Sequence, residues 1–236
     1  MKTAKQEYLD NEADAWFKRN LAMIEKRGPS IGTKFFADFY NRYRENNVKA
    51  HYRLGGEIGS CFGYNLAWLS EKFTDIHYHG IEPSEAAVTY GSEKYAELIK
   101  DGRINLIRGT ADELPFADES LDFILIGFCL YQADRKLLGK IVSEIDRCLT
   151  HGGFLVITDF DVLSGIKKNN IHNTLTPTYK LNYAKFFEGT FGYTLVEKTT
   201  YNADAVDARC FPIRMEDRVS TQILYKEHEN DIYIIR

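Results

Sequence analysis

The first 50 residues show the spacing of two amphipathic helices. In residues 6–26, apolar side chains recur every three or four positions, which is the period of a helix with one buried face. Gly28 and Pro29 end this segment, and residues 33–46 carry a second helical pattern that is rich in Phe and Tyr. We therefore predict an N-terminal helical cap over residues 1–50.

From about residue 52, short apolar runs alternate with helical segments. The predicted strands cover residues 52–58, 76–82, 104–108, 121–128 and 154–159, and the predicted helices cover residues 65–73, 83–100 and 136–148. Pro83 is expected in the first turn of its helix. Alternating strands and helices indicate right-handed crossovers and a parallel sheet that is covered on both faces. Residues 51–236 are thus predicted to form one doubly wound α/β unit.

The pattern becomes irregular after residue 160. A helix is expected near residues 182–188, and strands are expected near residues 193–200 and 219–226. The last two strands could pair as an antiparallel edge of the sheet. We therefore expect an insertion after the fifth strand, followed by a return to the sheet.

Charge and apolar run lengths narrow the range of partners. The chain has 30 Lys and Arg against 34 Asp and Glu, a net charge of −4, and it has no basic block. This composition argues against a nucleic-acid partner and against binding to an anionic membrane. The N-terminal segment lacks the apolar core of a signal peptide, and no apolar run reaches bilayer-spanning length. We expect a cytoplasmic protein.

The four cysteines give no sign of a metal or disulfide framework. They lie far apart, with no CxxC pair and no His at ligand spacing, at positions Cys61, Cys129, Cys148 and Cys210. This arrangement excludes a zinc module and fits a reducing compartment. We predict no metal site.

The loop after the first predicted strand is rich in glycine. Gly59 and Gly63 allow a tight turn into the next helix and a close approach of the backbone to a ligand. Ligands of doubly wound sheets bind beyond the carboxyl ends of the strands, where this loop lies. The spacing of Gly56, Gly59 and Gly63 does not match G-x-G-x-x-G, so a nicotinamide-dependent oxidoreductase is a poor alternative.

Glu82 stands at the end of the second predicted strand. A carboxylate at this position can accept hydrogen bonds from both hydroxyl groups of a ribose. The alternative is a solvated carboxylate that the dipole of the following helix stabilises. Together with the glycine loop, we favour ribose binding.

Four segments in order resemble the class I S-adenosylmethionine-dependent methyltransferases. They read EIGSCFG, GIEPS, GTADELPFADESLDFILI and EIDRCLTHGGFLVITDF, and they cover roughly residues 50–160. The resemblance is to the small-molecule branch that carries an LPF motif. It implies a Rossmann-like sheet of seven strands, mostly parallel, with S-adenosylmethionine as cofactor.

The resemblance also assigns cofactor-binding residues. The methionine side would be lined by Glu57, Gly59, Cys61 and Gly63, and the ribose would be held by Glu82. The adenine would be bracketed by Thr110, Ala111 and Asp112, and the sulfonium would be covered by Gly127 and Phe128. The set is completed by Asn65 and Pro83. Two positions depart from the family pattern. Cys61 replaces the central glycine, and Thr110 stands where the family often has an acidic residue. Whether Thr110 or Asp112 meets the adenine amine stays open.

The flanks carry a narrower similarity. WFKRN at 16–20, GYNL at 63–66 and FCLYQADR at 128–135 resemble methyltransferases that accompany bacterial surface-polysaccharide or nonulosonic-acid biosynthesis. The acceptor would then be a sugar or a related metabolite. Aromatic residues are denser in the N-terminal helices and around residues 160–201 than in the centre, and we expect these flanks to roof the acceptor pocket.

The predicted reaction is methyl transfer to an oxygen or nitrogen of a small-molecule acceptor. A general base is optional for such a transfer, and the catalytic candidates are His172, Tyr131 and Asp159. Asp159 could instead hydrogen-bond the irregular segment that follows it. The alternative function is that of a non-catalytic regulatory protein that binds S-adenosylmethionine or S-adenosylhomocysteine. A homodimer is left open.

Overall fold

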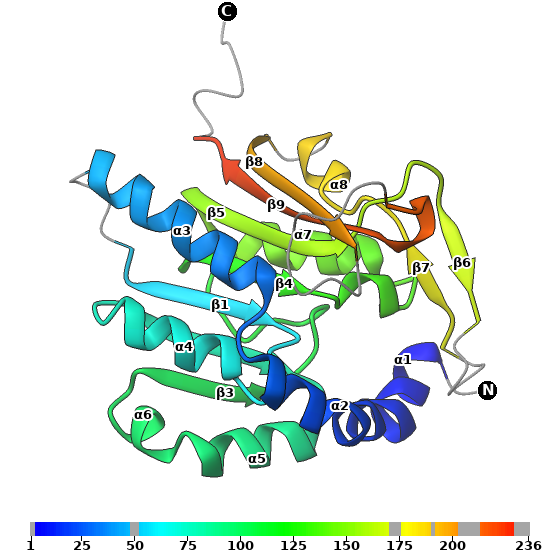
Figure 1. The fold of residues 1–236 in the computed structure, drawn as a ribbon, viewed down its shortest axis with the longest axis horizontal. Coiled ribbons are helices and arrows are strands. Elements are labelled where there is room, and N and C mark those ends of the chain that lie inside the picture. The colour runs from blue at the N-terminus through cyan, green and yellow to red at the C-terminus, as the bar shows by residue number, and fades with distance from the viewer. Residues whose placement is uncertain (1–2, 48–51, 170–175, 190–191, 203–212, 229–236) are drawn as a thin grey trace, which may run out of the picture.

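The computed structural model describes residues 3–47, 52–169, 176–189, 192–202 and 213–228 (Figure 1). Its centre is a seven-stranded sheet of order β3-β2-β1-β4-β5-β9-β8. The strands are β1 (Leu54–Ile58), β2 (His77–Glu82), β3 (Ile104–Arg108), β4 (Leu121–Gly127), β5 (Leu149–Phe160), β8 (Tyr193–Asn202) and β9 (Arg218–Lys226). The first five are parallel, whereas β9 pairs antiparallel with β5 and β8 antiparallel with β9. The predicted doubly wound, mostly parallel sheet is confirmed, as is its antiparallel edge.

Helices cover both faces of this sheet. They are α4 (Tyr64–Lys72), α5 (Glu85–Lys94), α6 (Ala96–Lys100), α7 (Leu138–Cys148) and α8 (Lys185–Glu188). Side chains of β4 alternate between the faces: Phe123 and Leu125 pack in the cluster that includes α4, and Ile124 and Ile126 in the cluster that includes α7. This period of two explains why the LDFILIG run is apolar at nearly every position. Pro83 lies before the N-cap Ser84, outside the first helical turn where it was predicted.

The N-terminal segment divides into two parts with different roles. α1 (Ala4–Glu7), a π-helical turn η1 (Tyr8–Glu12) and α2 (Ala13–Arg27) form one helical run beside the carboxyl ends of the parallel strands (Figure 1). α3 (Ile31–Asn46) instead packs on the sheet, where Phe36 and Tyr40 are fully buried against Phe123. Its aromatic residues therefore belong to the core of the sheet, whereas the segment before residue 28 and the first turn of α3 lie at the strand ends.

The insertion after β5 forms a small ribbon. β6 (Ile166–Lys168) and β7 (Thr178–Lys180) pair antiparallel, apart from the main sheet. Two short 3-10 turns, η2 (Leu130–Gln132) and η3 (Met215–Asp217), follow β4 and precede β9. Among the residues described above, no helix combines the length and apolar character that crossing a lipid bilayer requires.

Candidate active site

A cavity of about 950 Å³ opens at the carboxyl ends of β1, β2 and β4. Its walls come from three parts of the chain: α1 to the start of α3, the loops that follow the parallel strands, and the segment around β7. Ligand sites in proteins typically measure roughly 300–1,000 Å³. The cavity is therefore large enough for a nucleotide-sized cofactor and a second small molecule.

The glycine loop after β1 forms one wall of this cavity. Gly59 and Gly63 have positive φ angles of 75° and 78°, and a Cβ atom at Gly63 would lie 2.7 Å from the side chain of Leu106. Cys61 also has a positive φ of 52°, which is uncommon for a residue with a side chain. The backbone N–H of Cys61 donates to Oε2 of Glu82 at 2.8 Å. The turn that the glycines predicted is thus tied directly to the second strand.

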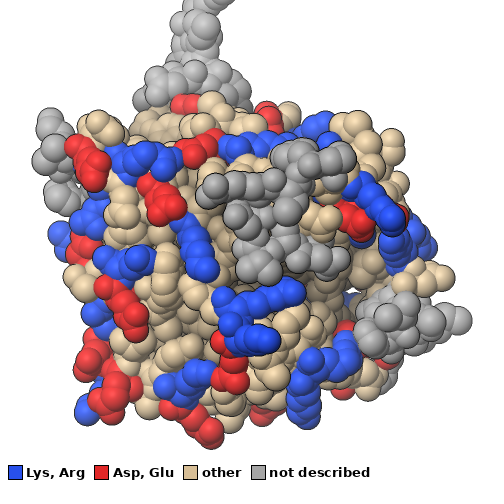
Figure 2. Space-filling model, in the orientation of Figure 1, with Lys and Arg blue, Asp and Glu red and all other residues tan. Residues whose placement is uncertain are grey.

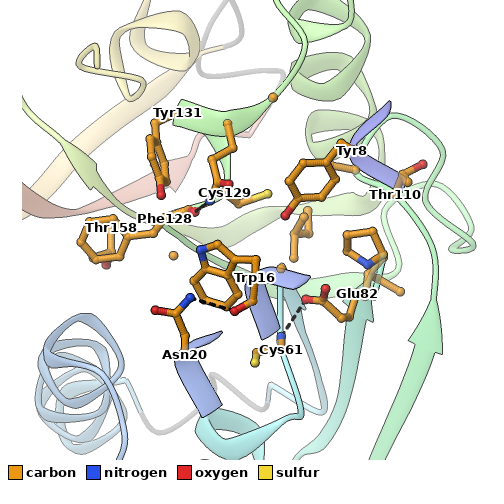
Figure 3. A pocket seen from close by; sticks show the side chains of 18 of the residues that line it. Tyr8, Trp16, Asn20, Cys61, Glu82, Thr110, Phe128, Cys129, Tyr131 and Thr158 are labelled. Atoms are coloured by element: carbon orange, nitrogen blue, oxygen red, sulfur yellow. Dashed lines mark hydrogen bonds between the residues drawn. The ribbon is translucent and has the colours of Figure 1, made fainter. Parts of the chain in front are cut away.

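Glu82 ends β2 and faces the cavity (Figure 3). Its second carboxylate oxygen, Oε1, accepts from the backbone N–H of Ser84 at 2.9 Å. Burial raises the pKa of Glu82 to about 7, although both backbone hydrogen bonds favour the charged form. In Figure 3 the phenol of Tyr8 projects into the cavity from the cap on the side of Glu82. A polar group of a ligand that binds at the end of β2 would therefore meet the carboxylate of Glu82, the one acidic side chain that this end contributes among the described lining residues.

The loop after β3 carries Thr110, Ala111 and Asp112, and all three line the cavity. Both carboxylate oxygens of Asp112 accept from Nζ of Lys5 at 2.8 Å. Burial acts to raise the pKa of Asp112, but the hydrogen bonds from Lys5 and Thr110 outweigh it, so the pKa is lowered. This ion pair ties the start of the N-terminal helices to the loop that was predicted to hold the adenine.

The end of β4 supplies the opposite wall. Gly127, Phe128, Cys129 and Tyr131 line the cavity, and a Cβ atom built on Gly127 would have no other atom within 4 Å. Burial raises the pKa of Tyr131, and it raises that of the Cys129 thiol to about 12. Both side chains are therefore neutral near pH 7, and neither can act as a base there.

Four of the predicted site residues do not line the cavity. Glu57, Gly63 and Asn65 lie behind the glycine loop, where Nδ2 of Asn65 donates to Oε1 of Glu57 at 2.7 Å and Oδ1 of Asn65 accepts from the backbone N–H of Ser30. Asp159 is 2 % exposed, and its carboxylate accepts the backbone N–H groups of Tyr131 and Phe160. His172 lies outside the described residues. Asp159 thus positions the Tyr131 segment in the described structure.

The N-terminal helices contribute lining residues from outside the predicted cofactor and catalytic set, and Trp16 belongs to the aromatic flank that was expected to roof the pocket. Tyr8, Trp16 and Asn20 line the cavity, and they follow one another at multiples of four positions along the run. Residues at this spacing lie near one face of a helix. The polar Asn20 at the end of this series was the sequence feature that indicated contact of this face with a ligand. From the second aromatic-rich flank, Tyr179 and Tyr201 line the cavity, whereas Phe187 and Tyr193 pack in the core.

Replacing Cys61 by glycine tests the unusual position in the loop. The left-handed conformation costs a residue with a side chain about 1–2 kcal/mol, which glycine would not pay. Loss of the buried thiol from its contacts with the cluster around Phe17 and Phe62 offsets part of this gain. We expect Cys61→Gly to leave S-adenosylmethionine affinity, measured by calorimetry, within about threefold of wild type. A loss of affinity beyond about tenfold would show that the thiol itself supports the ligand.

Buried carboxyl groups make the stability of the ligand-free protein depend on pH. Burial raises the pKa of Glu57 to about 8, and that of Glu82 and Asp159 to about 7. Between pH 4.5 and these values the folded state binds more protons than the unfolded state, so the free energy of unfolding falls as pH rises.

Glu57→Gln removes the titration of Glu57 and keeps its hydrogen bond, because the amide oxygen of glutamine can still accept from Asn65. We expect urea unfolding at about pH 5 and pH 8 to show a smaller loss of stability in Glu57→Gln than in wild type. An equal loss in both proteins would contradict the assignment. Glu93→Gln is the matched control, because Glu93 is an exposed glutamate with no resolved shift.

The cavity fits an adenosyl cofactor on two counts. A buried carboxylate faces it at the end of β2, and the bare backbone at Gly127 leaves open space where a side chain would stand. In the described part of the chain, no group of three or more His, Cys, Asp or Glu side chains is placed to hold a metal ion.

Comparisons with known proteins find similarity to methyltransferases. Residues 56–157 match the sequence family described as a methyltransferase domain. Demethylmenaquinone methyltransferase from Staphylococcus aureus is 31% identical over 109 residues, which are 46% of this chain and 39% of that relative. The chain thus spans about two-fifths of the length of the curated relative that it matches.

Solved structures show the same fold at low sequence identity. A methyltransferase from Methanosarcina mazei, described as S-adenosylmethionine-dependent, has a TM-score of 0.60 and 16% identity, covering 78% of this chain and 97% of its own. The 1,6-didemethyltoxoflavin-N1-methyltransferase of Burkholderia thailandensis, with its substrate and S-adenosylhomocysteine bound, has a TM-score of 0.61 and 12% identity, covering 84% and 79%. Residues 56–157, which contain most of the five parallel strands and the loops around Glu82 and Gly127, thus match a methyltransferase domain, and the chain shares the fold of these solved methyltransferase structures.

Proposed function

We propose that this chain transfers a methyl group from S-adenosylmethionine to an oxygen or nitrogen of a small-molecule acceptor. One observation carries the proposal: a single cavity is lined both by Glu82 and the glycine loop and by Trp16, Asn20, Thr158 and Tyr179. A cofactor and an acceptor can therefore share one cavity. The toxoflavin-type relative binds S-adenosylhomocysteine and its acceptor together, which is the arrangement that the proposal requires.

Glu82, the glycine loop and the Thr110 to Asp112 segment are proposed to hold the cofactor. When bound, S-adenosylmethionine supplies a methyl group on a sulfonium, which is reactive without further activation. The chain then has to orient the acceptor and exclude water. The cap serves both needs, because Tyr8 and Trp16 cover the cavity and the Lys5–Asp112 ion pair holds the cap in place.

The described side chains next to Gly127 and Phe128 offer no base, and Glu82 is assigned to the cofactor. Tyr131 and Cys129 are neutral near pH 7, and the carboxylate of Asp112 is paired with Lys5. We therefore propose an acceptor whose attacking atom is a neutral amine or an oxygen that is already deprotonated. The lone pair of that atom forms the new bond to the methyl carbon as the bond from carbon to sulfur breaks. A sugar-related metabolite is the finer acceptor class that the flank motifs favour, and an amino or carboxylate group on it, rather than a sugar hydroxyl, meets this requirement.

Binding and turnover separate this proposal from its alternatives. Calorimetry should show binding of S-adenosylmethionine and S-adenosylhomocysteine but not of NADH. A screen for S-adenosylhomocysteine release should then find turnover among amine, phenol and sugar acceptors. Binding without turnover on any acceptor would favour the non-catalytic regulatory protein. Failure to bind either adenosyl compound would overturn the proposal.

A further inference from the structure

The charged side chains of the cavity wall are unevenly distributed. Three acidic residues line the cavity, Glu82, Asp112 and Asp134, and Asp112 is paired with Lys5. The side formed by the last turn of α2 and the first turn of α3 carries Lys26, Arg27 and Lys34, with no acidic residue among its lining positions. Figure 2 shows Lys and Arg side chains lying together near the middle of the face where α2 and α3 meet.

Lys26, Arg27 and Lys34 have no side-chain partner among the described residues. Within those residues they make no ion pair or hydrogen bond through their side chains. Three other cations are paired: Lys5 with Asp112, Arg19 with Glu12 and Lys94 with Glu25.

A fourth cation stands across the same cavity. The guanidinium of Arg135 lies 5.0 Å from the ring centre of Tyr179 and donates to the hydroxyl of Tyr183 at 3.2 Å. In the part of the chain that the structure describes, it has no carboxylate partner. Its one charged neighbour along the wall is Asp134, whose carboxylate accepts the backbone N–H of Lys136.

Like charges repel where they are brought together, and their repulsion is relieved when an anion binds between them. Guanidinium and ammonium groups suit phosphate and carboxylate, the first by its paired N–H donors and the second as a mobile charge. Lys34 lies one turn into α3, so its side chain and the N-terminus of that helix share one end of the cavity. Trp16 and Met23 supply apolar wall between this end and the cofactor end.

We propose that the methyl acceptor carries a phosphate or carboxylate group, which Arg27 and Lys34 bind, with Lys26 beside them. This inference rests on the proposed function, because it assigns the part of the cavity beside α2 and α3 to the acceptor. It adds the chemical class: an anionic metabolite, held by its charged group at the α2–α3 end with its reacting atom toward Gly127 and Phe128.

The test uses protein saturated with S-adenosylhomocysteine, so that cofactor binding is established first. Failure at that step would count against the proposed function and not against the anion site. Calorimetry then compares matched probes: glucose 6-phosphate with glucose, 4-hydroxybenzoate with its methyl ester, and inorganic phosphate alone. We expect each anionic probe to bind at least about tenfold more tightly than its neutral partner, and the advantage to shrink in about 0.5 M salt.

The double variant Arg27→Ala/Lys34→Ala should abolish that preference while leaving S-adenosylhomocysteine affinity unchanged. Its matched control is Arg53→Ala/Lys185→Ala, which removes one arginine and one lysine whose side chains do not line the cavity. The control should retain the preference. Equal binding of charged and neutral probes, no binding of any anion at about 10 mM, or an unchanged preference in the double variant would each overturn the inference. Phosphate and carboxylate probes together show which anion is preferred.

Discussion

Glu82→Ala is expected to weaken S-adenosylmethionine binding on the order of 100-fold, because each hydrogen bond to a charged group contributes about 1.5–3 kcal/mol. The substitution removes the carboxylate that faces the cavity, and it also releases the N–H groups of Cys61 and Ser84 that this carboxylate holds. Both effects act at the same wall. The measurement is calorimetry with S-adenosylhomocysteine, accompanied by thermal unfolding without ligand.

Glu85→Ala is the matched control for this prediction. Glu85 lies three residues further on, does not line the cavity, and pairs with Arg108 at the surface. We expect its affinity for the cofactor to equal that of wild type. If Glu82→Ala bound the cofactor as tightly as Glu85→Ala, the assignment of Glu82 to the ribose would be wrong.

Gly127→Leu should eliminate cofactor binding and leave the fold intact. A Cβ atom at Gly127 meets no other atom within 4 Å, so the added side chain projects into the cavity without displacing its neighbours. The volume that it occupies is then lost to the ligand. We expect no detectable binding of S-adenosylhomocysteine by calorimetry, with the melting temperature within a few degrees of wild type.

Gly139→Leu provides the comparison. Gly139 also has open space around its Cβ position, but it lies on α7 away from the cavity. Leucine favours a helix over glycine by up to about 1 kcal/mol, so this variant should be slightly more stable and should bind normally. Normal binding by Gly127→Leu would mean that the ligand does not use this part of the cavity.

The sheet was predictable because its signals are local. The strand at 104–108 has the predicted bounds, and β1, β2 and β4 differ from their predictions by one or two residues. β5 begins five residues earlier than predicted, at Leu149. Gly152 and Gly153 lie inside it, although they stand between the predicted helix at 136–148 and the predicted strand at 154–159.

The cofactor wall was predictable from its position at the strand ends. Nine of the twelve predicted cofactor residues line the cavity, and the other three support the loop from behind. The part of the cavity proposed for the acceptor could not be predicted, because it depends on where the helical run from α1 to α2 lies after folding. Nothing in the sequence around Lys5 indicates that it reaches Asp112, 107 positions away, or that Lys34 and Arg135 border one space.

The composite wall of the cavity has a consequence for how this architecture diversifies. The stretch that matches the methyltransferase family ends at residue 157, whereas Trp16, Lys34 and Tyr179 come from outside it. In the proposed function, the matched stretch supplies most of the cofactor wall, and the N-terminal helices supply part of the acceptor wall. We expect exchange of the N-terminal helices between relatives to alter the acceptor more than the cofactor.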